Sequence, residues 1–360
     1  MDRRQLLQTT AYGTLLASLG ACANTSLVKS QAIGKTPPWP SEIHKIAFGS
    51  CIDQNKAQPI WQAILANQPD VFIFGGDNVY ASSQPWQLNQ LEKAYATQAA
   101  HAGFAQLRNT IAHVAIWDDH DMGLNDGGAE FAHKQVSQNA FLDFWRLPAN
   151  DPRRAREGLY HAMSFGKAGQ RVQIILLDTR SFRSAPRKTD RRDAPGKERY
   201  VPDTQPSKTM LGEAQWQWLT QQLQTPADLR FIVSGVQVAV EGHGWEGWHN
   251  FPLEQEKLRH VIRSTGAKGV VLLSGDRHIG AIYKSTSANL YPLYELTSSG
   301  MTHAWQAAKE AGPNRMGELI TQNHFALIEV DWQQRQMQWG FKNTQDEWLK
   351  KESIALSELQ

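Results

Sequence analysis

The sequence has few cysteines, no long hydrophobic run and no excess of either charge. Only two of its 360 residues are cysteines, so a framework of several disulfide bonds is excluded. The 37 Lys and Arg residues against 35 Asp and Glu residues give a formal net charge of +2, which argues against a general electrostatic field for nucleic acid. With 41% hydrophobic residues and 13 Trp, the chain can bury a sizeable core in one large domain or two small ones.

The first 22 residues are typical of an export signal. Arg3 and Arg4 precede a pair of leucines, as in twin-arginine signals, and the apolar stretch that follows is too short to span a membrane. The stretch ends in "LGAC" at residues 19–22, which resembles a lipobox in which Cys22 is acylated and the chain is cut before it. An ordinary secretory signal cut after "ACA" is the alternative. We therefore expect a bacterial lipoprotein that the twin-arginine machinery exports and that Cys22 anchors on the periplasmic side of the membrane.

The rest of the chain alternates between strand-like and helix-like runs. Residues 23–42, with "KTPPWP", are expected to form a tether, residues 43–345 a single catalytic domain and residues 346–360 a polar tail. Early strand–helix alternation followed by late antiparallel strands favours one α/β domain with two facing sheets. The basic run at 180–199 has several prolines and no apolar periodicity, so we interpret it as a solvated loop. No nucleic-acid-binding surface is evident.

Polar side chains follow four of the apolar runs, which are "KIAFGS", "VFIFGG", "HVAIWD" and "VVLLSG". These side chains are Cys51, Asp77, Tyr80, Asp119, His120, Asp276 and His278. The carboxyl ends of neighbouring parallel strands open into one crevice, so we expect the seven to lie together. Converging carboxylates repel one another unless cations neutralise them, and this predicts metal ions. Mostly oxygen ligands with one imidazole, one phenolate and one thiolate suit a hard trivalent ion, with a hard divalent ion as any second metal.

Each of these residues also has an ordinary structural interpretation. Cys51 can be a small buried hydrophobe, and Tyr80 can pack with its hydroxyl hydrogen-bonded. Asp118 and Asp121 are interpreted as turn formers in a glycine-rich loop. His120 is either a buried, hydrogen-bonded histidine or the group that protonates a leaving group.

Further residues are candidates for supporting roles. Arg180 follows a strand and is the candidate guanidinium fork on phosphate, with a surface ion pair as its alternative. Asn125 and Asp126 are either turn residues or outer supports that orient metal ligands. The loop with His243, Trp245 and Trp248 is a candidate rim of the substrate crevice.

The motifs resemble those of a known enzyme family. "GDxxY" at residues 76–80, "DDHD" at 118–121 and "GDxH" at 275–278 resemble the motifs of calcineurin-like metallophosphoesterases. "FGSC", "WDDHDMGLNDGG", "LLDTRSFR" and "LLSGDRHIG" occur in the order typical of the PhoD-type alkaline phosphatases, over roughly residues 43–300. The resemblance implies a four-layer α/β/β/α sandwich.

The resemblance also implies a metal centre of Fe(III) with calcium, with zinc, manganese or magnesium as alternatives. In it, Cys51 and Tyr80 hold the iron and Asp77 bridges the metals. Asp119 binds the second metal, and Asp276 and His278 complete the two coordination shells. Two departures count against a di-zinc or di-manganese centre. The first strand offers Cys51 where relatives have "DxH", and Gln237, a candidate outer support, lies near the place of a histidine in relatives.

The implied activity is metal-dependent hydrolysis of phosphoric esters. A metal-activated hydroxide in a two-metal site would attack phosphorus, in monoesters, diesters or both. A phospholipase D-like or teichoic-acid-like phosphodiesterase is the alternative substrate assignment. A lipid-anchored metal-binding protein without turnover is the alternative of another class.

Overall fold

The computed structural model describes residues 37–288 and 290–360. The expected export signal, with Arg3, Arg4 and Cys22, and most of the expected tether lie outside the described residues. Among the described residues, no helix has both the length and the apolar character that crossing a membrane requires.

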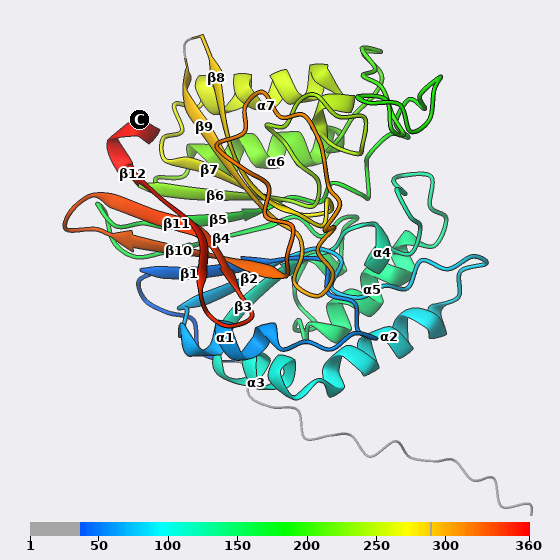
Figure 1. The fold of residues 1–360 in the computed structure, drawn as a ribbon, viewed down its shortest axis with the longest axis horizontal. Coiled ribbons are helices and arrows are strands. Elements are labelled where there is room, and N and C mark those ends of the chain that lie inside the picture. Colours follow the sequence, from blue (N-terminus) through cyan, green and yellow to red (C-terminus); the bar gives the residue numbers. More distant parts are fainter. Residues whose placement is uncertain (1–36, 289) are drawn as a thin grey trace, which may run out of the picture. The chain divides into compact units, whose positions relative to one another are not determined.

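Two six-stranded mixed sheets form the centre of the fold (Figure 1). The first has the order β12-β11-β10-β1-β2-β3, and the second has the order β4-β5-β6-β7-β9-β8. The strands of the first sheet are β1 (Lys45–Gly49), β2 (Val71–Gly75), β3 (Ala112–Ile116), β10 (His324–Asp331), β11 (Gln336–Asn343) and β12 (Trp348–Ala355). Those of the second are β4 (His161–Phe165), β5 (Val172–Leu176), β6 (Leu229–Ser234), β7 (Val270–Ser274), β8 (Gly280–Ser287) and β9 (Leu290–Ser298). The runs β1-β2-β3 and β5-β6-β7-β9 are parallel.

Helices cover the outer face of each sheet (Figure 1). The first sheet is covered by α1 (Ile60–Ala66), α2 (Leu88–Ala100), α3 (Ala102–Thr110) and α5 (Lys134–Phe144), with the short α4 (Asp119–Met122) beside them. The second sheet is covered by α6 (Gly212–Gln224) and α7 (Pro252–Ser264). The predicted four-layer α/β/β/α sandwich is confirmed.

The sequences of the central strands are continuous apolar runs because both faces of these strands are buried. In β2, Ile73 points into the core between the sheets, whereas Phe72 and Phe74 pack against Trp61 of α1. Alternate residues of one strand therefore fill two different cores, and this fixes the strand's register.

Two segments at the ends of the domain differ from expectation. Residues 346–360 were expected to form a polar tail, but they form the edge strand β12 and a 3-10 turn, Leu356–Leu359. Ile354, Leu356 and Leu359 join the core between the sheets, while charged residues face outward on this edge, as is usual for edge strands. At the other end, Trp39 of the expected tether lies 5.7 Å from Phe165 between ring centroids, so the tether's last residues pack on the domain.

Candidate metal centre

The candidate ligands follow the carboxyl ends of β1, β2, β3 and β7. The loops after β1 and β2 are joined by backbone hydrogen bonds, since Cys51 N donates to Gly76 O (3.3 Å) and Ile52 N donates to Asp77 O (2.8 Å). In the second sheet, the loop after β7 is joined to the loop after β6, since Gly275 N donates to Gly235 O. The two sheets are linked at this edge by Ser50 Oγ, after β1, which donates to Ser298 O at the end of β9 (3.0 Å).

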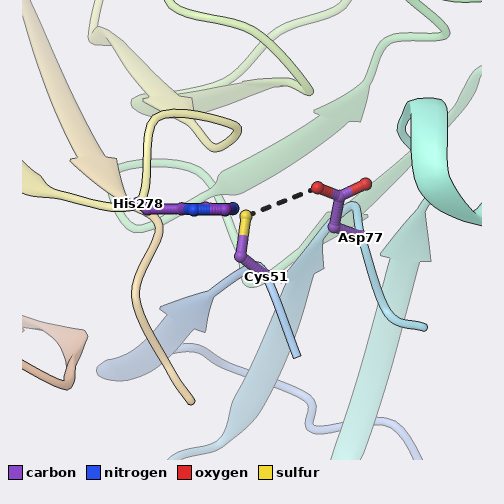
Figure 2. A group of neighbouring side chains, drawn as sticks. All are labelled: Cys51, Asp77 and His278. Carbon is purple, nitrogen blue, oxygen red and sulfur yellow. Dashed lines mark hydrogen bonds between the residues drawn. The ribbon is translucent and has the colours of Figure 1, made fainter. Parts of the chain in front are cut away.

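All seven of the predicted residues meet at this edge. Figure 2 shows Cys51, Asp77 and His278 converging, and the Cys51 thiol lies 3.6 Å from Asp77 Oδ2. The Tyr80 hydroxyl lies 3.3 Å from Asp77 Oδ2 and 3.0 Å from His278 Nε2. Potential ligand atoms form three groups, and the atoms of each group lie within 4.8 Å of one another. Asp77 belongs to the first two groups and Asp119 to the last two. The groups are Cys51 with Asp77 and His278, Asp77 with Asp119 and His120, and Asp118 with Asp119 and Asp276.

The backbone at this edge is strained. Cys51, Asp77, Asp276 and His278 have φ angles of 61°, 49°, 71° and 55°, in the left-handed region that non-glycine residues seldom adopt. Each such residue costs on the order of 1 kcal/mol and persists only where its surroundings impose it. Four strained residues among the candidate ligands indicate that the fold holds these side chains in place at the expense of stability.

Electrostatics at the centre favour bound cations. Burial, reinforced by repulsion from Asp119 and Asp118, raises the pKa of Asp77 well above its usual value. Burial also raises the pKa of Asp276 and of the Cys51 thiol. Asp118 Oδ2 and Asp119 Oδ1 are buried and accept no hydrogen bond. Unpartnered buried oxygens in a crowd of acids fit hard cations as their missing partners.

Asp119 differs from its neighbours. Burial alone would raise the pKa of Asp119, but the charges of His120 and Arg180 lower it below its usual value. Asp126 N also donates to Asp119 Oδ2 at 2.7 Å. Asp119 is therefore held as a carboxylate at the first residue of α4.

His120 is oriented toward a cavity beside these ligands. Its Nδ1 lies 2.6 Å from Ser82 Oγ, and its ring centroid lies 4.3 Å from that of Tyr80. Because Ser82 occupies Nδ1, Nε2 is the ring nitrogen left for a substrate. The cavity, of ≈210 Å³, is lined by Asp77, Asp119, His120, Asn125, Asp126, Arg199, Trp245, Glu246, Asp276, Arg277, His278 and Trp305.

Arg180 does not line this cavity, which corrects its expected role as a phosphate fork. Its side chain is fully buried, with Nε on Asp118 Oδ1 and Nη1 2.8 Å from Glu246 Oε2. These carboxylates raise the pKa of Arg180 despite its burial. Arg180 therefore ties together the loops that carry Asp118 and Glu246, and its guanidinium is not free for phosphate.

The remaining expectations have mixed outcomes. Asn125 and Asp126 line the cavity, and Asp126 accepts hydrogen bonds from Arg199 Nη1 and the Tyr200 hydroxyl at 2.8 and 2.7 Å. Gln237 does not support the ligands, because its amide donates to the Tyr283 hydroxyl and Thr297 Oγ1. Asp121 accepts a hydrogen bond from Asp118 N, as expected of a turn former. Of the predicted rim residues, only Trp245 lines the cavity, whereas His243 and Trp248 are buried.

The loop after β9 was not anticipated from the sequence. Ser299 Oγ lies 3.1 Å from Cys51 Sγ and accepts from His278 N at 2.7 Å. Thr302 Oγ1 donates to Cys51 O, and the His303 ring lies 4.3 Å from that of His278. The signal was a further apolar run ending in polar residues, "YELTSSGMTH", but its serine and threonine hydroxyls are too common to stand out.

Comparison with known proteins agrees with this geometry. The sequence model of the PhoD-like phosphatases matches residues 46–335. The chain belongs to this family. A curated relative, alkaline phosphatase D of Bacillus subtilis (strain 168), is 26% identical over 223 residues, which is 56% of this chain and 35% of the relative. The chain thus spans about a third of that relative's length.

Solved structures share the fold of this PhoD-like chain. PhoD superposes with a TM-score of 0.70 at 17% identity, over 89% of this chain and 70% of PhoD. A purple acid phosphatase from yellow lupin (Lupinus luteus) seeds gives a TM-score of 0.59 at 12% identity, over 88% of this chain and 55% of the lupin chain. Plasmodium GAP50, an anchor in the inner membrane complex, gives 0.55 at 11% identity, over 87% of this chain and 89% of its own. At these identities the likeness establishes the metallophosphoesterase-type fold alone.

Proposed function

We propose that the protein is a metal-dependent hydrolase of phosphoric esters, acting on monoesters, diesters or both. One observation carries the proposal, which is the convergence of Cys51, Asp77, Tyr80, Asp119, Asp276 and His278 beside a polar cavity. Membership of the PhoD-like phosphatase family supports the same reaction.

The ligand set favours two different hard cations. Cys51, Tyr80 and His278 around Asp77 suit Fe(III), and the carboxylates of Asp119 and Asp276 suit calcium, or else zinc, manganese or magnesium. Bound cations of this kind neutralise phosphoryl oxygens and lower the pKa of water, which supplies the nucleophile. Asp77 belongs to two of the ligand groups and would be shared between the metals.

The chain's own residues would position the ester and its leaving group. Arg199 and Arg277 bring positive charge to the cavity, where a phosphate carries negative charge. Trp245 and Trp305 form an apolar wall, with ring centroids 5.6 Å apart. His120, fixed by Ser82, would give a proton from Nε2 to the departing alcohol.

Replacing single ligands tests the proposal. Asp276→Asn and His278→Ala should lower turnover of p-nitrophenyl phosphate and bis-p-nitrophenyl phosphate at least ~100-fold, because each removes a metal ligand. His260→Ala, on the outer helix α7, is the matched control and should keep wild-type rates. Wild-type turnover in both ligand variants would refute the proposed centre. The ratio of monoester to diester rates in the wild type distinguishes a phosphatase from a phosphodiesterase of the phospholipase D-like or teichoic-acid-like kind.

The metals themselves need a separate measurement. Elemental analysis of the purified holoprotein should find iron and calcium, and a phenolate on Fe(III) should give a visible absorption band that Tyr80→Phe removes. A colourless, iron-free and fully active protein would contradict the proposed role of Tyr80.

We also propose export as a lipoprotein, which rests on the sequence of residues 1–22. Cys22→Ser should then release the protein from the membrane fraction of a bacterial host, and retention of this variant would refute lipidation.

A further inference from the structure

The basic run that follows Arg180 forms an ordered arm. Residues 185–200 fold back on themselves, with antiparallel bridges between Lys188 and Tyr200 and between Ala194 and Lys197. Thr189 N donates to Arg199 O, and Val201 N to Arg187 O, at 2.9 and 3.0 Å. As expected of a solvated loop, the segment contains no helix or strand and most of its residues are exposed, but these backbone hydrogen bonds give it a defined shape.

The arm is fixed against the loop that carries Trp245. Arg199 N and Tyr200 N both donate to Gly244 O, at 2.9 and 2.7 Å, and Gly244 N donates back to the Glu198 side chain. The approach is so close that a Cβ on Gly244 would lie 2.5 Å from Glu198 N. The arm is thus held beside the cavity of the candidate metal centre.

A second cavity lies under the arm and shares part of its wall with the first. Its volume is ≈370 Å³, and Lys188, Thr189, Arg192 and Tyr200 line it. Asn125, Asp126 and Arg199 line both cavities. The two cavities therefore adjoin, and we call them together the groove, from the candidate metal centre past Arg199 to Lys188 and Arg192.

The far end of this groove has an excess of positive charge. Between residues 185 and 200 the exposed charged side chains are Arg187, Lys188, Asp190, Arg191, Arg192, Asp193 and Lys197. In the part of the chain that the structure describes, no carboxylate oxygen lies within 4.0 Å of Lys188 Nζ. Among the described residues, Arg192 pairs only with Asp193, at 3.8 Å, and both side chains are about three-quarters exposed. Such an exposed pair contributes little, so both cations are available to a ligand.

We propose that this groove binds phosphate esters whose organic part carries a further phosphate, with Lys188 and Arg192 holding that second phosphate. The inference rests on the proposed hydrolysis of phosphoric esters at the metal centre. Arg199, between the two cavities, would lie beside the linker between the two phosphates. The second phosphate belongs either to a small bisphosphate or to the next unit of a phosphodiester polymer, and the groove recognises the chemistry that both share.

Substrates that differ by one phosphate test the inference on the holoprotein. Thymidine monophosphate, thymidine bisphosphate and a short thymidylate oligomer with a terminal phosphate share one nucleoside. The wild type should hydrolyse the bisphosphate or the oligomer with a kcat/KM about tenfold above that of the monophosphate, mainly through KM. Preference for the oligomer over the bisphosphate identifies a polymer, and the reverse identifies a small bisphosphate. Added salt should reduce the preference, because exposed charges are screened.

Charge reversal at the far end should remove the preference. In Lys188→Glu/Arg192→Glu the KM for thymidine bisphosphate should rise about tenfold while kcat changes little. Lys268→Glu, on the opposite edge beside β7, is the control and should keep the wild-type ratio. Equal kcat/KM values for all three esters in the wild type, or an unchanged ratio in the double variant, would overturn the inference.

Failure of the proposed reaction is distinguishable from failure of this inference. If no ester is hydrolysed, the proposed reaction is wrong, but calorimetric titration with thymidine bisphosphate still measures the affinity of the groove for a second phosphate. Binding that weakens in Lys188→Glu/Arg192→Glu and not in Lys268→Glu supports the second phosphate site. Equal affinity in all three proteins refutes it.

Discussion

At the scale of single residues, His120 has an environment suited to proton transfer. Ser82 Oγ holds Nδ1 at 2.6 Å, and the ring stacks obliquely on Tyr80 at the wall of the cavity. A general acid matters most when the leaving group is a poor one, because such a group cannot depart without a proton.

We therefore expect His120→Gln to discriminate between esters. Its kcat should fall about 100-fold for an alkyl phosphate and about tenfold or less for p-nitrophenyl phosphate, whose leaving group departs readily. Ser82→Ala should give smaller losses of kcat, again larger for the alkyl phosphate, because it removes only the hydrogen bond that orients the His120 ring. An equal loss for both esters in His120→Gln, as measured by steady-state kinetics, would instead point to a role in binding.

The metal-ligand candidates were recognisable from the sequence because each directly follows an apolar strand. Asp77 and Asp276 come after glycines at the ends of β2 and β7, and parallel strands bring such ends together. Arg180 has the same signal, two residues beyond Asp178, yet its side chain pairs with carboxylates and does not line the cavity. Position after a strand does not reveal whether a long side chain points into the crevice or back into the protein. In this chain Asp118 and Glu246 decide that, and Glu246 is 66 residues away along the chain.

At the scale of elements, Arg180 joins three loops at the open edge of the sandwich. Its guanidinium contacts Asp118 at the start of α4, Gly127 O in the acid-rich loop and Glu246 beside Trp245. Glu246 in turn accepts from Arg183 Nη2 at 2.8 Å. Removing one member of such a buried network leaves the other charges without compensation.

Arg180→Met should accordingly destabilise the fold by about 3–5 kcal/mol. The measurement is the free energy of unfolding in urea. Arg192→Met is the control, because Arg192 pairs with Asp193 and both side chains are about three-quarters exposed, and it should cost less than about 1 kcal/mol. A stable Arg180→Met variant with only a raised KM would restore the sequence-based interpretation of Arg180 as a phosphate ligand.

The arm and the final strand show what sequence patterns leave out at the scale of elements. The arm is a largely exposed loop, as expected, but its defined shape could not be predicted, because the backbone bonds to Gly244 that hold it leave no pattern in side chains. β12 was missed because "WLKKES" places charges on an edge strand, whereas only Ile354 shows that one face is buried. Strands and helices with two buried faces, or with one clear apolar face, were predicted well.

At the scale of the whole molecule, the sandwich buries histidines that are not candidate metal ligands. His324 in β10 is fully buried, with Nδ1 2.8 Å from Gln322 O and with Nε2 unpartnered. His113 in β3 packs against Trp145, and its Nδ1 donates to Ile111 O at 2.9 Å. Burial lowers the pKa of each to about 4, from an ordinary value of 6.5.

This burial predicts a loss of stability in mild acid. Below about pH 6.5 the unfolded chain takes up protons at these histidines while the folded chain does not, so their contribution is complete above that pH and is lost as the pH falls toward 4. For His324 the difference corresponds to at most ~3 kcal/mol. The buried acids whose pKa is raised, such as Asp77 and Asp276, change stability in the opposite sense, so the histidine contribution is measured by difference. Between pH ~7 and pH ~5 the free energy of unfolding in urea should change less favourably for the wild type than for His324→Gln. His44→Gln, at an exposed position, should behave as the wild type does. An equal change in the wild type and in His324→Gln would show that buried neutral histidines are not the cause.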